Sequence, residues 1–167
     1  MSTDSALSGR PIVGRPCSIA SALSVVGEKW ALLVVRELFL GNRRFDRIAA
    51  NTGAPRDILT TRLRTLERAG IVTRRAYQDR PPRFEYRLTE AGRDLQPVLH
   101  ALRTWGDKWA VDDTPLAIQH RGPDGTAHVL DAGTFCRTCG QEVHNRDLSV
   151  ESRVPGWSRE GRVAEAG

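Results

Sequence analysis

Apolar residues recur at helical spacing through the first part of the chain. They predict a first helix over about 17–26, ended by Gly27. The segment 29–40 is apolar around most of its circumference, which predicts a second, heavily buried helix that stops at Gly41. This second helix is the expected centre of the core.

Two further helices are predicted before residue 70. Phe45 and Ile48 mark a short third helix, which the turn 51–53 closes. Pro55 is suited to the first position of a fourth helix, which runs to about Ala69. One side of this helix carries Leu59, Leu63 and Leu66, and the opposite side carries Arg56, Asp57, Thr60, Thr61, Arg64 and Arg68.

The hydrophobic period then changes to two. VTRRAYQ (72–78) and FEYRL (84–88) predict a β-hairpin whose tip is 79–83. Thr89 is predicted to cap a fifth helix, bent near Pro97. One face of that helix carries Leu95, Leu99, Leu102, Trp105 and Trp109. Beyond this helix no regular hydrophobic period continues. TAHVL and GTFC are candidate short strands.

Charge divides the chain unevenly. Residues 1–112 hold 19 Lys and Arg against 12 Asp and Glu, whereas residues 113–167 hold 6 against 8. Arginine outnumbers lysine 23 to 2, and its planar, forked donors suit phosphates and guanine edges. The basic surface is therefore expected in the front part of the chain, on a mainly helical protein with a small β-hairpin.

No secretory signal or membrane span is apparent. The longest apolar run, 30–40, is interrupted by Arg36 and Glu37, and a span needs about 20 apolar residues. Three cysteines are too few for an extracellular disulfide framework. These features predict a cytoplasmic protein.

Two short helices joined by a glycine-containing turn and followed by a basic hairpin predict a winged helix-turn-helix. A helix about 10–12 Å across fits a major groove about 12 Å wide. Arg56, Thr60, Thr61 and Arg64 are the candidates for base or groove contact. Arg80 and Arg83 at the hairpin tip, and Arg43 and Arg44 before the third helix, are the candidates for phosphate contact. The alternative for each arginine is an ordinary solvated surface.

From Cys17 to Trp109 the chain resembles the HxlR-type regulators, which are relatives of the MarR type. The resemblance is carried by GEKWALLVVRELFLGNRRF, ILTTRLRTLERAGIV, RRAYQDRPPRFEYRLTEAG and PVLHALRTW. It implies a bacterial, nucleoid-associated regulator of transcription, more often a repressor, that binds double-stranded DNA. It also implies a homodimer whose first and last helices form much of the interface, on a pseudo-palindromic operator.

The resemblance suggests two kinds of signal. Cys17 lies where redox-sensing members carry a cysteine, at a helix start that favours the reactive thiolate; a buried structural thiol is the alternative. Other members respond to small aromatic compounds, and Trp30, Trp105 and Trp109 could line such an effector pocket. Aromatic residues at this spacing more often belong to the core or to a dimer interface.

The C-terminal part contains CRTCG, in which Cys136 and Cys139 have the spacing of a zinc knuckle. Zinc needs two further ligands, for which His120 and then His144 are the candidates in a zinc-ribbon-like extension. A redox-active dithiol and an inert remnant remain open. No other cofactor is expected.

The expected organisation has four parts: a flexible arm over 1–15, a winged helix-turn-helix domain for DNA binding and dimerisation over 16–111, a small extension over 112–150 and a disordered tail over 151–167. An enzyme is not expected, because no G-x-G-x-x-G, P-loop or Ser/His/Asp set is present. The rival function is a winged helix that binds a protein or RNA partner.

Overall fold

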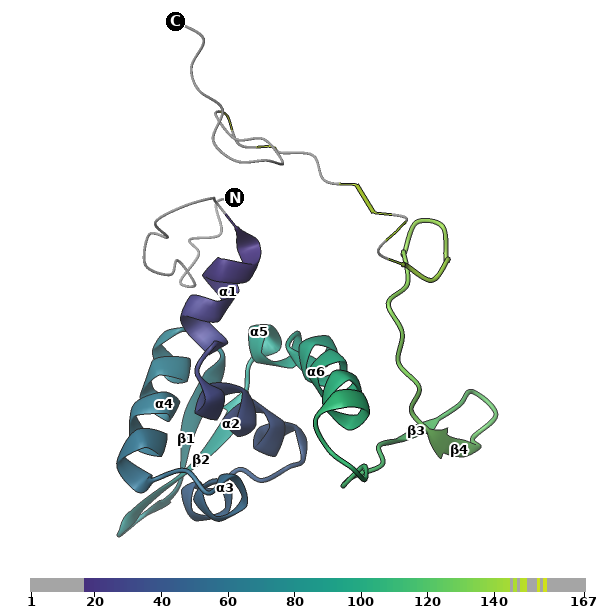
Figure 1. Cartoon of the computed structure of the whole chain (residues 1–167). Coiled ribbons are helices and arrows are strands. Elements are labelled where there is room, and N and C mark those ends of the chain that lie inside the picture. The colour runs from purple at the N-terminus through teal and green to yellow at the C-terminus, as the bar shows by residue number, and fades with distance from the viewer. Residues whose placement is uncertain (1–16, 145, 147, 150–152, 154, 156–167) are drawn as a thin grey trace, which may run out of the picture. The chain divides into compact units, whose positions relative to one another are not determined.

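Helices occupy most of the positions at which the apolar spacing predicts them. The computed structural model describes residues 17–144, 146, 148, 149, 153 and 155 (Figure 1). The expected arm over 1–15 lies outside these residues, as does the expected tail over 151–167 except at Arg153 and Pro155. The chain divides after Leu99 into two units.

The first unit is built on four helices. They are α1 (Ser18–Val26), α2 (Lys29–Phe39), α3 (Phe45–Thr52) and α4 (Arg56–Arg68). α2 lies at the centre, as its apolar sequence predicts, and packs against α1, α3 and α4. Pro55 precedes α4 as its cap rather than forming its first residue. The fully buried core includes Val34, Val35, Ile48, Leu59, Leu63, Leu66 and Val72.

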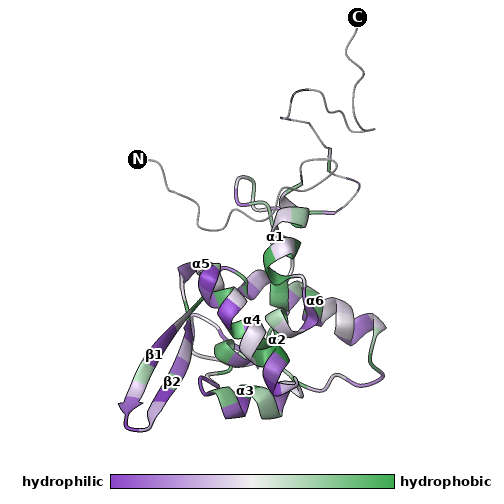
Figure 2. Cartoon of the chain, turned by 90° about the vertical axis from the view of Figure 1, so that its left-hand side faces the viewer, coloured by the Kyte–Doolittle hydropathy of each residue, from purple (hydrophilic) through white to green (hydrophobic). Residues whose placement is uncertain are grey.

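The predicted β-hairpin follows α4. β1 (Val72–Asp79) pairs antiparallel with β2 (Pro82–Leu88), and a bulge interrupts the register between Ala76 and Gln78. Asp79 lies opposite Pro82, so the tip is only Arg80-Pro81 and the five-residue tip expected at 79–83 is wrong. Figure 2 shows this hairpin as a largely hydrophilic ribbon that extends away from the helices. The fold is therefore mainly helical with a small β-hairpin wing, as predicted.

The single fifth helix expected after Thr89 is in fact two. Thr89 Oγ1 accepts the Gly92 N–H and caps α5 (Glu90–Arg93), and α6 (Gln96–Trp109) begins after a short break. Pro97 lies in the first turn of α6, where its missing N–H leaves no hydrogen bond unmade, so it does not bend a longer helix. Leu95 and Leu99 pack against the core of the first unit.

The second unit contains small β-hairpins. β3 (Gln119–Arg121) pairs with β4 (Ala127–Val129), so the candidate strand in TAHVL is confirmed and its partner was missed. In the segment GTFC, Phe135 forms an isolated antiparallel bridge with Glu142. Within the described part of the chain no single helix is long and apolar enough to cross a membrane; α1 and α2 pass that test only as a pair bent by 78°.

Candidate nucleic-acid interface

α4 has two chemically different faces. Its three leucines are at most 1% exposed and fasten the helix to the core. The other side carries the exposed residues Arg56, Asp57, Thr61, Arg64 and Arg68, with Thr60 half-buried beside them. A helix that is anchored along one side presents the opposite side as a rigid polar surface.

The turn between α3 and α4 sets the direction of α4. Gly53 has a φ of +69°, in the left-handed region that favours glycine. Thr52 Oγ1 donates to the carbonyl oxygen of Ile48 (2.7 Å) and accepts the N–H of Ala54 (3.2 Å). Ile48 and Ala54 are buried on either side of the turn. The pair α3–α4 is thus a helix-turn-helix with a fixed internal angle.

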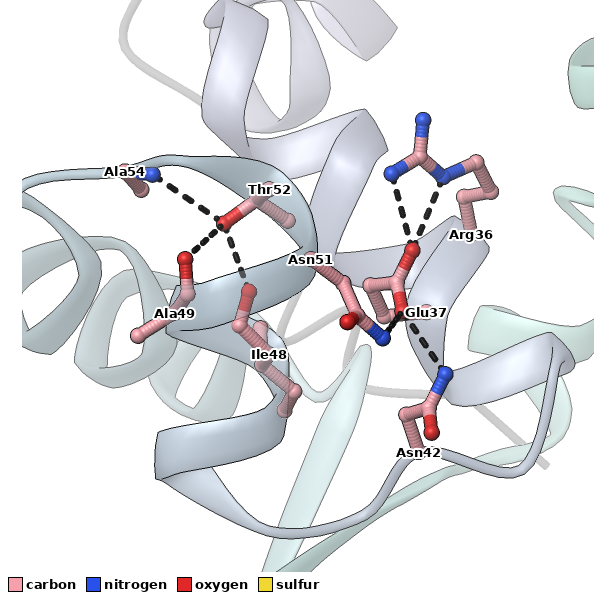
Figure 3. Close-up of polar contacts among 8 residues, drawn as sticks. All are labelled: Arg36, Glu37, Asn42, Ile48, Ala49, Asn51, Thr52 and Ala54. Carbon is pink, nitrogen blue, oxygen red and sulfur yellow. Dashed lines mark hydrogen bonds and ion pairs between the residues drawn. The ribbon is translucent and has the colours of Figure 1, made fainter.

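A buried carboxylate fastens α3 to α2 (Figure 3). Glu37 is 2% exposed, and its Oε2 accepts hydrogen bonds from Nδ2 of Asn42 (2.8 Å) and Nδ2 of Asn51 (2.7 Å). Its Oε1 accepts two from Arg36, the shorter at 2.8 Å. Both oxygens are therefore satisfied, and the network joins α2, the segment after it and the end of α3.

The ionisation of Glu37 follows from this network. Burial alone would raise its pKa, but hydrogen bonds from Asn51, Arg36 and Asn42, together with the charge of Arg36, leave the pKa below its ordinary value of 4.5. Glu37 is thus a buried anion at neutral pH. We did not predict this site from the sequence; the available signal was an acidic residue at a core position of a largely apolar helix.

Arg56 is held by α3 in the unbound protein. Its Nη1 lies 2.9 Å from Oδ1 of Asp46, and its guanidinium lies 4.8 Å from the centre of the Phe45 ring. Both charged side chains are largely exposed, so this ion pair is weak. The contacts orient Arg56 without preventing its transfer to a phosphate or a guanine.

Two threonines of α4 donate their hydroxyl protons to backbone carbonyl oxygens of the same helix. Thr60 donates to the carbonyl oxygen of Arg56 (2.7 Å), and Thr61 donates to that of Asp57 (3.0 Å). A hydroxyl has one donor and two acceptor sites. In this arrangement the two side chains offer acceptor lone pairs and methyl groups, which suit base amino groups and thymine methyls.

The segment before α3 is attached to the wing. The backbone N–H of Tyr86 donates to the carbonyl oxygen of Arg43 (2.8 Å), and Arg44 forms an isolated bridge with Glu85. The guanidinium of Arg44 lies 4.9 Å from the centre of the Tyr77 ring. Arg43 and Arg44 are both exposed, so the structure places these phosphate candidates beside the middle of the hairpin.

The basic surface of the wing is not confined to its tip but extends along both strands. Arg80 and Arg83 are exposed, as are Arg74, Arg75 and Arg87 along the strands. Arg74 stacks on the ring of Phe84 at 3.5 Å, and Arg87 pairs with Glu85 at 2.6 Å. The strand arginines were not singled out from the sequence; the available signal was the number of charged residues in VTRRAYQ and FEYRL.

The expected signal-sensing residues lie in different settings. Cys17 caps the start of α1 in an extended conformation and is exposed in the single chain, unlike a buried structural thiol. Trp30 packs against the core of the first unit, which suits the core alternative. On α6, Trp105 and Trp109 are 61% and 67% exposed. That the three tryptophans line one effector pocket remains a prediction.

The two cysteines of CRTCG occupy one tight turn. Hydrogen bonds from the backbones of Cys139 and Thr138 and from the Cys139 thiol lower the pKa of Cys136 to about 7. His120 instead packs edge to face with His128 across the β3–β4 hairpin, at 5.1 Å between ring centres. Among the described residues no three His, Cys, Asp or Glu side chains gather as a metal site, so His120 and His144 do not join the thiols there.

A helix-turn-helix followed directly by a basic antiparallel hairpin defines a winged helix-turn-helix protein. Residues 25–114 match the HxlR-like helix-turn-helix family. The chain belongs to this family.

Relatives and solved structures agree with that assignment. An HTH-type transcriptional regulator of Mycobacterium bovis is 39% identical over 151 residues, covering 89% of this chain and 92% of that protein. Another from Synechocystis is 44% identical over 97 residues, covering 58% and 72%. The structure of PA1607, described as a transcription factor, has a TM-score of 0.68 at 30% identity and covers 83% of this chain and 95% of its own.

A second structure, the transcription factor PA1374 of Pseudomonas aeruginosa, has a TM-score of 0.55 at 31% identity and covers 87% of this chain and 98% of its own. The matches to the M. bovis protein and to these two structures are too long to end at residue 114, so they include part of the C-terminal extension. The chain is an HTH-type transcriptional regulator, which implies DNA binding, and proteins of this family are not enzymes.

Proposed function

We propose that this chain is a repressor that binds a pseudo-palindromic operator in duplex DNA as a homodimer. The observation that carries the proposal is α4, whose leucine face is fully buried while Arg56, Thr61 and Arg64 are exposed and Thr60 lies half-buried beside them. In this mode α4 enters the major groove, and its residues contact base edges. Repression is the commoner outcome implied by the family resemblance.

The wing supplies affinity rather than sequence choice. Arg80 and Arg83 at the tip contact phosphates or the adjacent minor groove, and Arg43 and Arg44 contact phosphates nearer the helices. Each phosphate contact releases counterions, so it steepens the dependence of affinity on salt by roughly 0.9 in the logarithmic slope. Losing one of these arginines should therefore weaken binding to every sequence alike.

Exposed apolar side chains support the dimer. Ile19 and Leu23 on α1 are 71% and 56% exposed, and α6 exposes Leu102, Trp105 and Trp109 on one face. Apolar surface of this kind on a folded chain marks an interaction site. A twofold dimer would present two copies of α4 about one helical turn of DNA apart, roughly 34 Å.

Location and regulation follow from the same proposal. A regulator that binds the chromosome works in the bacterial cytoplasm with the nucleoid. Control of its DNA affinity by oxidation of Cys17, or by a small aromatic effector bound near Trp30, Trp105 and Trp109, is part of the proposal; the exposed thiol of Cys17 supports the first route.

The test is fluorescence anisotropy with duplexes from the protein's own promoter region and scrambled duplexes, each at two salt concentrations. Arg64→Ala should reduce the preference for the operator by about 1–3 kcal/mol, because it removes a base contact. Arg80→Ala should weaken both duplexes equally and lower the salt slope by about 0.9. Arg121→Ala, which removes an exposed arginine of β3, is the matched charge control and should change neither.

Three outcomes would overturn the proposal. Equal affinity for all duplexes, or equal losses in all three variants, would mean that the basic surface attracts DNA without reading it. Weak duplex binding combined with tight binding of a folded RNA, or of a protein partner, would establish the rival function for the same winged helix.

A further inference from the structure

The tip that holds Cys136 and Cys139 is a well-formed hairpin. The N–H of Cys136 donates to the carbonyl oxygen of Gln141 (2.9 Å), and the N–H of Val143 donates to that of Thr134 (2.8 Å). The N–H of Gly140 closes the turn by donating to the carbonyl oxygen of Cys136 (2.8 Å), and its φ is +73°. Glycine adopts this conformation without strain, so the C-x₂-C-G sequence and the turn fit each other.

This turn brings both sulfur atoms to one side. The sulfur of Cys136 accepts hydrogen bonds from the backbones of Cys139 and Thr138 and from the Cys139 thiol. Two thiols held at one tight turn with the C-x₂-C spacing are placed as the two sulfur ligands of one ion are in a zinc knuckle. Both cysteines are free thiols, and Cys139 is exposed. The hairpin therefore presents two sulfur ligands to the solvent.

Two thiolates in this arrangement are half of a structural zinc site. Structural zinc is almost always bound by four ligands in a tetrahedron, and thiolates are among its preferred ligands. In the part of the chain that the structure describes, no third His, Cys, Asp or Glu joins the pair. Within those described residues, the chain supplies no ligand for the remaining two positions of the zinc tetrahedron.

We propose that the Cys136–Cys139 hairpins of two copies of the chain together bind one zinc ion through four thiolates. A symmetric pair of chains offers the same patch twice, so a second hairpin supplies the two missing ligands with the same geometry. Each thiol loses its proton on binding. The four-thiolate site is then negatively charged overall, and Arg137, located between the two cysteines of each hairpin, provides the compensating charge.

The inference uses the homodimer of the proposed function to bring two copies together, but it concerns a different surface. A zinc link between the extensions would join the C-terminal parts of two chains that already share a DNA site. It would also hold them together when a chain leaves the operator. The same sulfurs could instead form a disulfide within one chain, which requires an oxidant, and the test includes that outcome.

The test measures zinc and mass on the full chain. The protein is purified under reducing conditions, loaded with Zn²⁺ and desalted, and its metal content and native mass are determined. We expect about half an ion per chain, carried by a species with two chains. Cys136→Ser and Cys139→Ser should each reduce the zinc content at least roughly tenfold, whereas Cys17→Ser, the same change at the remaining cysteine, should retain it.

Three results would overturn the inference. One ion per chain on a monomer would mean that another residue of the same chain completes the site, and His144→Ala would then identify it. No bound zinc in the reduced protein, or an intramolecular disulfide found by thiol counting, would assign the pair to another role. The anisotropy titration of the same samples separates the two proposals, since operator binding by a zinc-free dimer leaves the proposed function intact.

Discussion

Asp46 of α3 holds the first arginine of α4, with 2.9 Å between Asp46 Oδ1 and Arg56 Nη1. A carboxylate on the DNA-facing side of a regulator repels phosphates and at the same time orients the cation that it contacts. Under the proposed function, Asp46 should therefore have two opposite effects on DNA binding. It should lower affinity for any duplex, and it should limit the directions in which Arg56 can point.

The variant Asp46→Asn should separate these effects. We expect its affinity for scrambled duplex to rise by roughly two- to fivefold, as expected for the loss of one exposed charge interaction. The affinity for the operator should rise less, because Arg56 is no longer oriented, so discrimination falls. Asp57→Asn changes a neighbouring exposed carboxylate that forms no ion pair with any described residue, and it is the control. A lower affinity of Asp46→Asn for scrambled duplex would contradict the idea.

A second prediction concerns the buried anion of α2. Glu37→Gln replaces one acceptor oxygen by an amino group that faces the donors of Arg36 or of Asn42 and Asn51. A buried polar group that loses its partner is costly, so the free energy of unfolding should fall by about 2–4 kcal/mol. Glu67→Gln, at an exposed position on α4, should change it by less than about 0.5 kcal/mol. Urea denaturation followed by circular dichroism measures both.

The same carboxylate predicts how stability depends on pH. Because the pKa of Glu37 is lower in the folded chain than its ordinary value of 4.5, its contribution is present above about pH 4.5 and is lost as the pH falls through the folded-state pKa. The unfolding free energy of the wild type should therefore decline in acid more steeply than that of Glu37→Gln. Parallel acid limbs for the two proteins would show that folding does not lower the pKa of Glu37.

Particular residues show which parts of the structure can be predicted from the sequence. The stripe Leu59, Leu63 and Leu66 determined the orientation of α4, and its polar side followed directly. Asn51 shows the limit, since it was interpreted only as part of a turn. In the structure it donates to a carboxylate 14 positions earlier in the chain. Helical spacing describes one element at a time, so a hydrogen bond between elements leaves no periodic signal.

The break between α5 and α6 shows a second limit. Leu95 lies in the break and Leu99 and Leu102 follow it in α6, so their helical spacing could not reveal that α5 ends at Arg93. The wing tip was misplaced for a related reason, because Pro82 was assigned to the loop while it pairs with Asp79 at the strand edge. Strands of three residues such as β3 are too short for any period to be recognised.

A further prediction concerns the dimer interface. Leu102 and Trp105 lie on the exposed apolar face of α6. Placing a charge there by Leu102→Glu should weaken dimerisation by about 2–4 kcal/mol, or roughly 30- to 1000-fold. Val129→Glu makes the same kind of change at an exposed apolar residue of β4 and should leave the mass unchanged. Sedimentation equilibrium distinguishes the two, and a fully dimeric Leu102→Glu variant would remove α6 from the interface.

The last prediction concerns Gly92, the residue that lets α5 pack against the α4–β1 connection. Gly92 is buried, and a Cβ at this position would collide with the carbonyl oxygen of Ile71. That oxygen already accepts the N–H and the hydroxyl of Thr89, both at 3.1 Å, so it has little freedom to move. Alanine is normally favoured over glycine in a helix. At Gly92 we expect the opposite, so that alanine destabilises the protein relative to glycine.

Gly92→Ala should lower the free energy of unfolding by about 1–3 kcal/mol or more, the range for inserting atoms into a packed site. Gly53→Ala is the comparison, because Gly53 has a positive φ but open space around its Cβ position, and only backbone strain of about 1–2 kcal/mol is added. Shifting α5 also shifts the start of α6, so Gly92→Ala should weaken dimerisation as well, whereas Gly53→Ala should affect DNA binding through the α3–α4 turn. A Gly92→Ala variant that is more stable than the wild type would show that α5 does not pack on Ile71 in solution.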